Sequence, residues 1–177
     1  MPGTNPRSRT TLPLLIGFFD MAGFTRVAQA LDDQVLAEVV DIVYTAIGEA
    51  VATSGGRVLK YIGDGALATW PPEQADAAVA SAIGLRRYIG ERLQSYGVHS
   101  EPVIRFHFGP VVAGKFGPVG AEVDDITGKH VFIAARLPAR TLSVSADAFR
   151  RLSPELRKQL KKHSEPVVYI PVDDPRP

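Results

Sequence analysis

The chain has 177 residues, of which 45% are hydrophobic and 22% charged, with a formal net charge of +1 and no cysteine. This composition fits one globular domain with a full core, and the near-neutral charge does not favour duplex nucleic acid or an anionic membrane as the main partner. Without cysteine, disulfides, thiolate chemistry and cysteine-ligated zinc sites are excluded.

We do not expect a secretory signal in the N-terminal segment. Residues 1–11 contain proline, glycine, asparagine and serine without periodicity, and we expect them to form a flexible arm. They lack the apolar stretch of a secretory signal, and the apolar run Leu12–Phe19 is too short to cross a bilayer. We therefore expect a cytoplasmic protein with one domain over residues 12–172 and a tail over residues 173–177.

The first apolar run predicts a buried strand that ends at Asp20 and is followed by a tight turn at Ala22-Gly23. A carboxylate at the end of a buried strand is costly unless a cation lies nearby, either a basic side chain or a metal ion. The next segment, Leu31–Thr53, has apolar residues at helical spacing and predicts a helix that ends at Ser54-Gly55-Gly56.

A second acidic turn follows this helix. Arg57–Ile62 and Ala66–Trp70 predict the strands of a β-hairpin around Gly63-Asp64-Gly65. Asp20 and Asp64 therefore have the same local sequence pattern, a lone aspartate near glycine at the end of a predicted strand. Carboxylates bind hard divalent cations, and glycine allows the backbone to approach phosphates, so the pair predicts a two-metal phosphate site.

The second half of the chain alternates helical and strand patterns. We expect helices over Glu73–Tyr96 and Gly128–Leu137, strands over Val103–Phe108, Pro110–Lys115, Val123–Ile126, Thr141–Ser145 and Pro166–Val172, a bend at Gly109, and short helices capped by Ser145 and Ser153. The order of elements predicts an α+β fold with a ferredoxin-like βαββαβ core and additional C-terminal strands and helices.

Five segments form an ordered set of motifs: Phe19–Thr25 (FDMAGFT), Lys60–Gly65 (KYIGDG), Arg105–Gly114 (RFHFGPVVAG), Asp125–Gly128 (DITG) and Ala134–Leu137 (AARL). Together they resemble the catalytic domain of the class III nucleotidyl cyclases. Each motif alone is weakly specific, but the match spans residues 12–172. In that family the ribose 3′-hydroxyl of a nucleoside triphosphate attacks the α-phosphorus, pyrophosphate leaves, and cyclic AMP or cyclic GMP is formed.

The resemblance implies a metal site and a phosphate-binding turn. Asp20 and Asp64 match the residues that bind two divalent cations, Mg²⁺ or Mn²⁺, and the backbone carbonyl of Met21 matches a further ligand. The turn that follows matches the one that donates backbone N–H groups to the substrate phosphates, and its residues here are Ala22, Gly23, Phe24 and Thr25.

The resemblance also implies base recognition and a dimer. Lys60 and Asp125 match the pair that reads the purine edge, where a lysine donor and an aspartate acceptor suit adenine. Arg136 matches the arginine that stabilises charge at the α-phosphate, and Lys161 or Lys162 matches loosely a lysine that holds the triphosphate. In the family these residues and the metal carboxylates come from different subunits, which implies a homodimer with two composite sites.

One position departs from the family pattern. Phe132 stands where the family usually has an asparagine that positions the ribose, and phenylalanine cannot hydrogen-bond the sugar. Losing one such contact can cost on the order of 100-fold in rate. Lys129 and His130 replace small or polar residues, and we expect structural roles for His107 and His130 because no second ligand lies at metal spacing.

Several functions therefore remain open from the sequence. The first is a cyclase that makes cyclic AMP from ATP. The alternatives are a cyclase for GTP or a pyrimidine triphosphate, and a catalytically weak or inactive module that binds nucleotide or dimerises.

Overall fold

The computed structural model describes residues 9–163 and 166–174. Within these ranges the chain forms one eight-stranded sheet in the order β2-β3-β1-β4-β6-β8-β7, with β5 paired to β4. The strands are β1 (Thr10–Met21), β2 (Arg57–Ile62), β3 (Gly65–Trp70), β4 (Pro102–Phe116), β5 (Val123–Thr127), β6 (Leu142–Ser145), β7 (Leu160–His163) and β8 (Val168–Pro171). The helices are α1 (Phe24–Ala30), α2 (Asp33–Thr53), η1 (Pro72–Gln74), α3 (Ala75–Gln94), α4 (Lys129–Arg136), α5 (Ala146–Phe149) and α6 (Pro154–Arg157).

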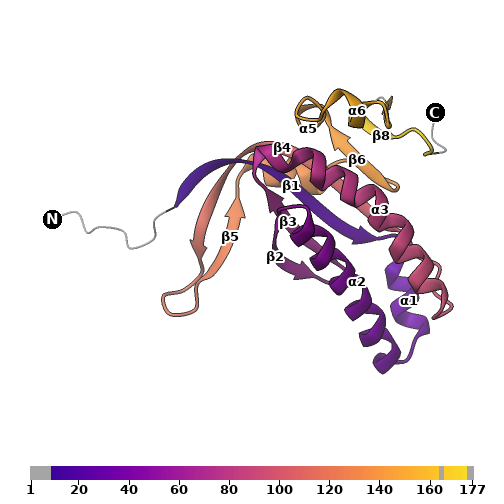
Figure 1. Cartoon of the computed structure of the whole chain (residues 1–177). Helices are drawn as coiled ribbons and strands as arrows, with labels where there is room; N and C mark the ends of the chain where they lie inside the picture. Colours follow the sequence, from indigo (N-terminus) through magenta and orange to yellow (C-terminus); the bar gives the residue numbers. More distant parts are fainter. Residues whose placement is uncertain (1–8, 164–165, 175–177) are drawn as a thin grey trace.

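The predicted ferredoxin-like core is confirmed. Strand β1 lies between β3 and β4 and is antiparallel to both, and β2 pairs with β3 at the edge. Helices α2 and α3 lie together across one face of the sheet, and the hairpin formed by β4 and β5 projects from the body of the domain (Figure 1). No helix in residues 9–163 and 166–174 is both long and apolar enough to span a membrane.

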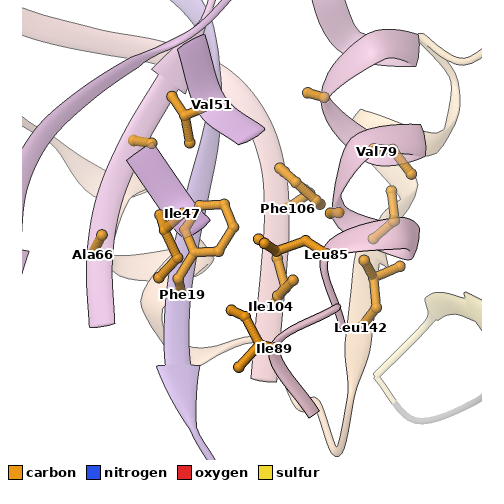
Figure 2. Close-up of a cluster of buried hydrophobic side chains, with 14 of the residues drawn as sticks. Phe19, Ile47, Val51, Ala66, Val79, Leu85, Ile89, Ile104, Phe106 and Leu142 are labelled. Atoms are coloured by element: carbon orange, nitrogen blue, oxygen red, sulfur yellow. The ribbon is translucent and has the colours of Figure 1, made fainter. Parts of the chain in front are cut away.

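The main core lies between the sheet and helices α2 and α3. Alternate residues of β1 point into it, among them Leu15 and Phe19. Phe19 lies near Ile47 of α2, and its ring contacts that of Phe106 of β4 edge-on (Figure 2). Trp70 fills the space beside Gly17, where a Cβ atom would lie 2.7 Å from the indole ring. This tight packing explains why the residues of the strands and helices that face this core are apolar.

The opposite face of the sheet carries a smaller cluster beneath α4. Its buried members are Ile16, Leu67, Val111, Ile126 and Ala134. Because side chains alternate along a strand, Asp20 of β1 shares this face with Ile16. By the same alternation, Arg105 and His107 of β4 lie here rather than among the main core residues.

The predicted bend at Gly109 is wrong. Strand β4 runs without a turn from Pro102 to Phe116, and Gly109 lies opposite Leu14 in its ladder with β1. A Cβ atom at Gly109 would lie 2.2 Å from Nδ1 of His130. The glycine is therefore required for a close approach of α4, and the chain reverses later, between Phe116 and Val123.

Other predicted elements hold with shifted ends. Helix α2 starts at Asp33, because Asp32 accepts a hydrogen bond from the backbone of Gln34 at 3.0 Å. The capping roles of Ser145 and Ser153 are confirmed, since each hydroxyl accepts a hydrogen bond from the first turn of its helix. Helix α1 and strand β7 were not predicted, because both are too short to show a clear period. Strand β1 begins at Thr10, inside the expected arm, whose first eight residues lie outside the described residues.

Candidate active site

Asp20 and Asp64 lie close together at one end of the sheet. Asp20 is the penultimate residue of β1, and Asp64 lies in the turn between β2 and β3. Oδ2 of Asp64 accepts a hydrogen bond from the backbone N–H of Met21 at 3.1 Å. Burial raises the pKa of the Asp64 carboxyl above its ordinary value, and the negative charge of Asp20 raises it further.

This pair has the chemistry of a cation site. Two carboxylates that repel each other are stabilised by a positive charge between them, and carboxylate oxygens are ligands that Mg²⁺ and Mn²⁺ prefer. Among the described residues no group of three or more histidine, aspartate or glutamate side chains gathers as a metal site. Asp20 and Asp64 therefore fit a cation that takes its remaining ligands from backbone carbonyls, water or a bound phosphate.

The position of Asp64 depends on the backbone around it. A Cβ atom at Gly65 would lie 2.0 Å from the carbonyl oxygen of Phe19, so only glycine lets the turn approach the end of β1. Gly63 has a φ of +60°, in the left-handed region that favours glycine. The hydroxyl of Tyr44 on α2 donates a hydrogen bond to the Gly63 carbonyl at 2.5 Å, and its ring stacks on Tyr61.

The predicted phosphate turn leads directly into α1. Gly23 has a φ of +68° and precedes the first residue of that helix, Phe24. The N–H of Ala22 donates to the carbonyl of Glu101 at 2.9 Å, so this group is already occupied. The N–H of Arg26 donates to the carbonyl of Gly23 at 3.0 Å, which leaves the N–H groups of Gly23, Phe24 and Thr25 as candidate donors.

Lys60 and Asp125, the predicted base-reading residues, form an ion pair. The pair joins β2 to β5, strands that are not neighbours in the sheet, and a second ion pair between Arg57 and Asp124 runs beside it at 3.5 Å. The other carboxylate oxygen of Asp125 accepts a hydrogen bond from the N–H of Ile126 at 2.8 Å. The structure thus brings together two residues that lie far apart in the sequence.

Phe132 and Arg136 lie on the outer surface of α4. They are separated by one helical turn, so both side chains lie on the same side of the helix. Phe132 is 64% exposed, and Arg136 is also exposed. Within this one chain, neither residue is brought into contact with Asp20 or Asp64 by any hydrogen bond or ion pair among the described residues.

Lys161, the loosely matched triphosphate lysine, lies on β7. Its ammonium group donates a hydrogen bond to the backbone carbonyl of Asp174 at 2.7 Å. The neighbouring Lys162 pairs with Tyr169 in the ladder between β7 and β8.

Arg105 is a site residue that the sequence did not single out. Its Nη1 atom lies 3.7 Å from Oδ2 of Asp20, and its Nε–H donates to the carbonyl of Leu137 at 3.0 Å. The sequence does show that Arg105 lies between the apolar residues Ile104 and Phe106, so its side chain points to the opposite face of β4. In the folded chain this is the face that Asp20 shares. That placement needs the pairing of β1 with β4, which the sequence alone does not provide.

Two histidines attach α4 to the sheet. Nε2 of His107 and Nδ1 of His130 lie 2.8 Å apart, and Nδ1 of His107 lies 2.8 Å from the hydroxyl of Ser145. Burial lowers the pKa of His107 below its ordinary value, and the neighbouring His130 lowers it further. The pair fixes the first turn of α4, the helix that carries Phe132 and Arg136.

Comparison with known proteins finds no family model that matches the chain, but it finds similar sequences. The chain is 33% identical over 155 residues to adenylate cyclase 2 of Rhizobium meliloti, covering 77% of this chain and 41% of that protein. It is 32% identical over 124 residues to an adenylate cyclase of Streptomyces coelicolor, covering 70% of this chain and 29% of that protein. The chain therefore spans less than half the length of these relatives.

The structural comparison extends over almost the whole chain. The adenylyl cyclase CyaB from P. aeruginosa superimposes with a TM-score of 0.81 at 20% identity, covering 96% of this chain and 98% of that one. The fold is therefore that of a class III nucleotidyl cyclase catalytic domain. Together with the sequence relatives, this shows that the chain belongs to the class III nucleotidyl cyclase family.

Proposed function

We propose that the chain is a nucleotidyl cyclase that converts ATP into cyclic AMP and pyrophosphate. The observation that carries the proposal is the convergence of Asp20 and Asp64, from separate strand ends, into one pair of mutually repelling carboxylates. The names of the two sequence relatives, both adenylate cyclases, support the same activity.

In this account the carboxylates of Asp20 and Asp64 and the carbonyl of Met21 hold two divalent cations. When bound, such cations lower the pKa of the attacking hydroxyl and neutralise the triphosphate. The N–H groups of the turn at Gly23 orient the phosphates. Arg136 supplies a permanent positive charge where negative charge develops around the α-phosphorus.

Lys60 and Asp125 read the base. In the free chain the two side chains form an ion pair with each other, and an entering adenine replaces this ion pair with hydrogen bonds to both residues. The lysine donates to a ring nitrogen and the aspartate accepts from the exocyclic amine. The hydrogen bond from Ile126 keeps the Asp125 carboxylate oriented while its partner changes.

Each site is completed by a second copy of the chain. Lys60 and Asp64 are close in sequence, yet Lys60 points to β5 while Asp64 points to the end of β1. Phe132 and Ile133 form an exposed apolar surface on α4, beside Arg136, which favours contact with another chain. A homodimer would bring Arg136 of one copy to the carboxylates of the other.

A second candidate function is a nucleotide-binding or dimerisation module without turnover. Phe132 favours it, because a phenylalanine that is exposed on α4 provides no hydrogen bond for a ribose. Binding of a triphosphate without any product would be its signature.

An assay of the purified chain decides between the two. The chain is incubated with Mn²⁺ and each of the four ribonucleoside triphosphates, and cyclic product is measured by chromatography. We expect cyclic AMP from ATP, and we expect Asp20→Ala to abolish it. A folded, dimeric chain that forms no cyclic nucleotide from any of the four would contradict the cyclase, and activity that survives Asp20→Ala would show that the metal site is elsewhere.

A further inference from the structure

The contact between Arg105 and Asp20 joins two parts of the proposed site through one side chain. The guanidinium lies beside the Asp20 carboxylate, and its Nε–H is bound to the carbonyl of Leu137. Leu137 directly follows Arg136 at the end of α4. Arg105 thus connects a carboxylate of the metal pair with the end of the helix that carries the transition-state arginine.

Arg105 is held firmly in this position. Its side chain is only 19% exposed, whereas that of Asp20 is 52% exposed. The hydrogen bond to Leu137 fixes the plane of the guanidinium, so the charge does not swing freely into solvent. The guanidinium therefore places a fixed positive charge beside the Asp20 carboxylate.

A fixed positive charge at this place has two effects on a cation site. In the metal-free chain it offsets the negative charge of Asp20. The sequence alone left open whether a basic side chain or a metal ion would do so. When a divalent cation binds to the same carboxylate, the guanidinium repels it. Even at water-like screening, the repulsion between a single and a divalent charge that share one carboxylate weakens binding of the divalent ion by about tenfold.

We propose that Arg105 is a positioning residue that lowers the affinity of Asp20 for a free divalent cation, an inference that rests on the proposed metal site. The chain then binds a cation weakly by itself and takes it up together with the phosphates of a nucleotide, which add ligands and negative charge. The consequence is that an empty site does not fill with metal before its substrate arrives.

The test measures Mn²⁺ binding to the full chain without nucleotide, by the loss of the free-ion signal in electron paramagnetic resonance. Asp20→Asn gives the background of unspecific binding. Arg105→Gln removes the charge and retains an amide donor, and we expect it to bind Mn²⁺ about three- to tenfold more tightly than the natural chain. Arg105→Lys retains the charge, and we expect its affinity to remain within about twofold of the natural chain.

Lys158→Gln is the matched control for net charge. Lys158 forms an exposed ion pair with Glu155 at α6, an element to which neither Arg105 nor Asp20 belongs. We expect this substitution to leave Mn²⁺ affinity unchanged. The gain in Arg105→Gln should also shrink at high salt, because salt screens the repulsion that the substitution removes. Combined with Asp20→Asn, Arg105→Gln should have no effect on binding.

An affinity in Arg105→Gln equal to or weaker than that of the natural chain would overturn the proposal, provided that Asp20→Asn shows the site is real. If Arg105→Gln does not fold, a loss of affinity in Arg105→Lys of more than about tenfold would overturn it as well, since that variant keeps the charge. A natural chain that shows no Asp20-dependent Mn²⁺ binding and no cyclic product would instead contradict the proposed function itself.

Discussion

The two faces of the sheet use the same strands for different purposes. Toward α2 and α3, strands β1 and β4 present Leu15, Phe19 and Phe106, which are buried against aliphatic and aromatic side chains. Toward α4, the alternate residues of the same strands include Asp20 and Arg105. The apolar face therefore provides the stability that allows the other face to hold charges close together.

Replacing Asp64 by asparagine should have the largest effect on activity without a loss of stability. Asp64→Asn keeps the shape of the side chain but removes a charge that a cation needs, and we expect cyclase activity to fall roughly 1000-fold. Stability should not fall, because burial and Asp20 already raise the pKa of this carboxyl and so disfavour its charged form in the folded chain.

The same substitution should change the pH dependence of stability. Since the pKa of Asp64 is higher in the folded chain, the unfolded chain loses this proton first as the pH rises. The stability that Asp64 contributes is therefore complete below its unfolded pKa and is lost as the pH rises through its folded pKa. Thermal melts of the two chains from pH 3.5 to 7 should diverge with rising pH in favour of Asp64→Asn; a variant that is less stable at pH 7 would contradict this account.

Truncating a side chain on the apolar face should instead lower the stability of the chain. Phe106 is fully buried, and its ring packs edge-to-face on Trp70 with centroids 5.6 Å apart. We expect Phe106→Ala to lower the free energy of unfolding by about 3–5 kcal/mol in urea titrations. Tyr88→Ala, at an exposed position of α3, is the control and should stay within about 0.5 kcal/mol. A Phe106→Ala loss below that of the control would show that this face is not the main core.

Changing Phe132 tests whether the charged face also retains the family's ribose contact. We expect Phe132→Asn to raise the cyclisation rate severalfold and by at most about 100-fold, because it restores a group that can hydrogen-bond the sugar. Phe132→Leu is the control and should not raise the rate. An active natural chain whose rate is unchanged by Phe132→Asn would show that the ribose is held in another way.

The histidine pair gives the smallest effect, at acidic pH. Since burial lowers the pKa of His107, the unfolded chain takes up a proton below about pH 6.5 that the folded chain does not. Stability should therefore fall as the pH drops below this value, by up to about 1 kcal/mol per pH unit. Melts from pH 7.5 to 5 should show a smaller fall in His107→Gln than in the natural chain, with exposed His99→Gln as the control. Equal slopes in all three chains would contradict this role.

The elements of the fold were predictable where hydropathy had a clear period. Helices α2 and α3 and the β2–β3 hairpin match the prediction within a few residues, because long amphipathic helices and a turn of Gly63-Asp64-Gly65 leave strong local signals. The bend placed at Gly109 failed because glycine there serves a contact with His130, a residue that approaches only through tertiary packing. Local sequence does not distinguish these two uses of glycine.

The candidate site was predictable where a motif carried it, and its supporting contacts were not. Asp20 and Asp64 were predicted from their own strand-end pattern, and Lys60 and Asp125 from family motifs. The structure brings Asp64 to the end of β1 beside Asp20, and it joins Lys60 to Asp125 in an ion pair. Arg105 and Tyr44 were missed, because their importance depends on which strand or turn lies beside them. Strand pairing and helix docking decide these contacts, and neither can be deduced from spacing alone.

The most direct test of the account is complementation between two inactive variants. Asp64→Asn removes a carboxylate of the proposed metal site, and Arg136→Ala removes the arginine proposed to stabilise the transition state. If the two halves of a site come from different chains, a mixed dimer contains one intact site, and an equal mixture should regain about a quarter of the natural activity. A mixture in which mixed dimers form but activity stays at the level of the separate variants would contradict the composite site.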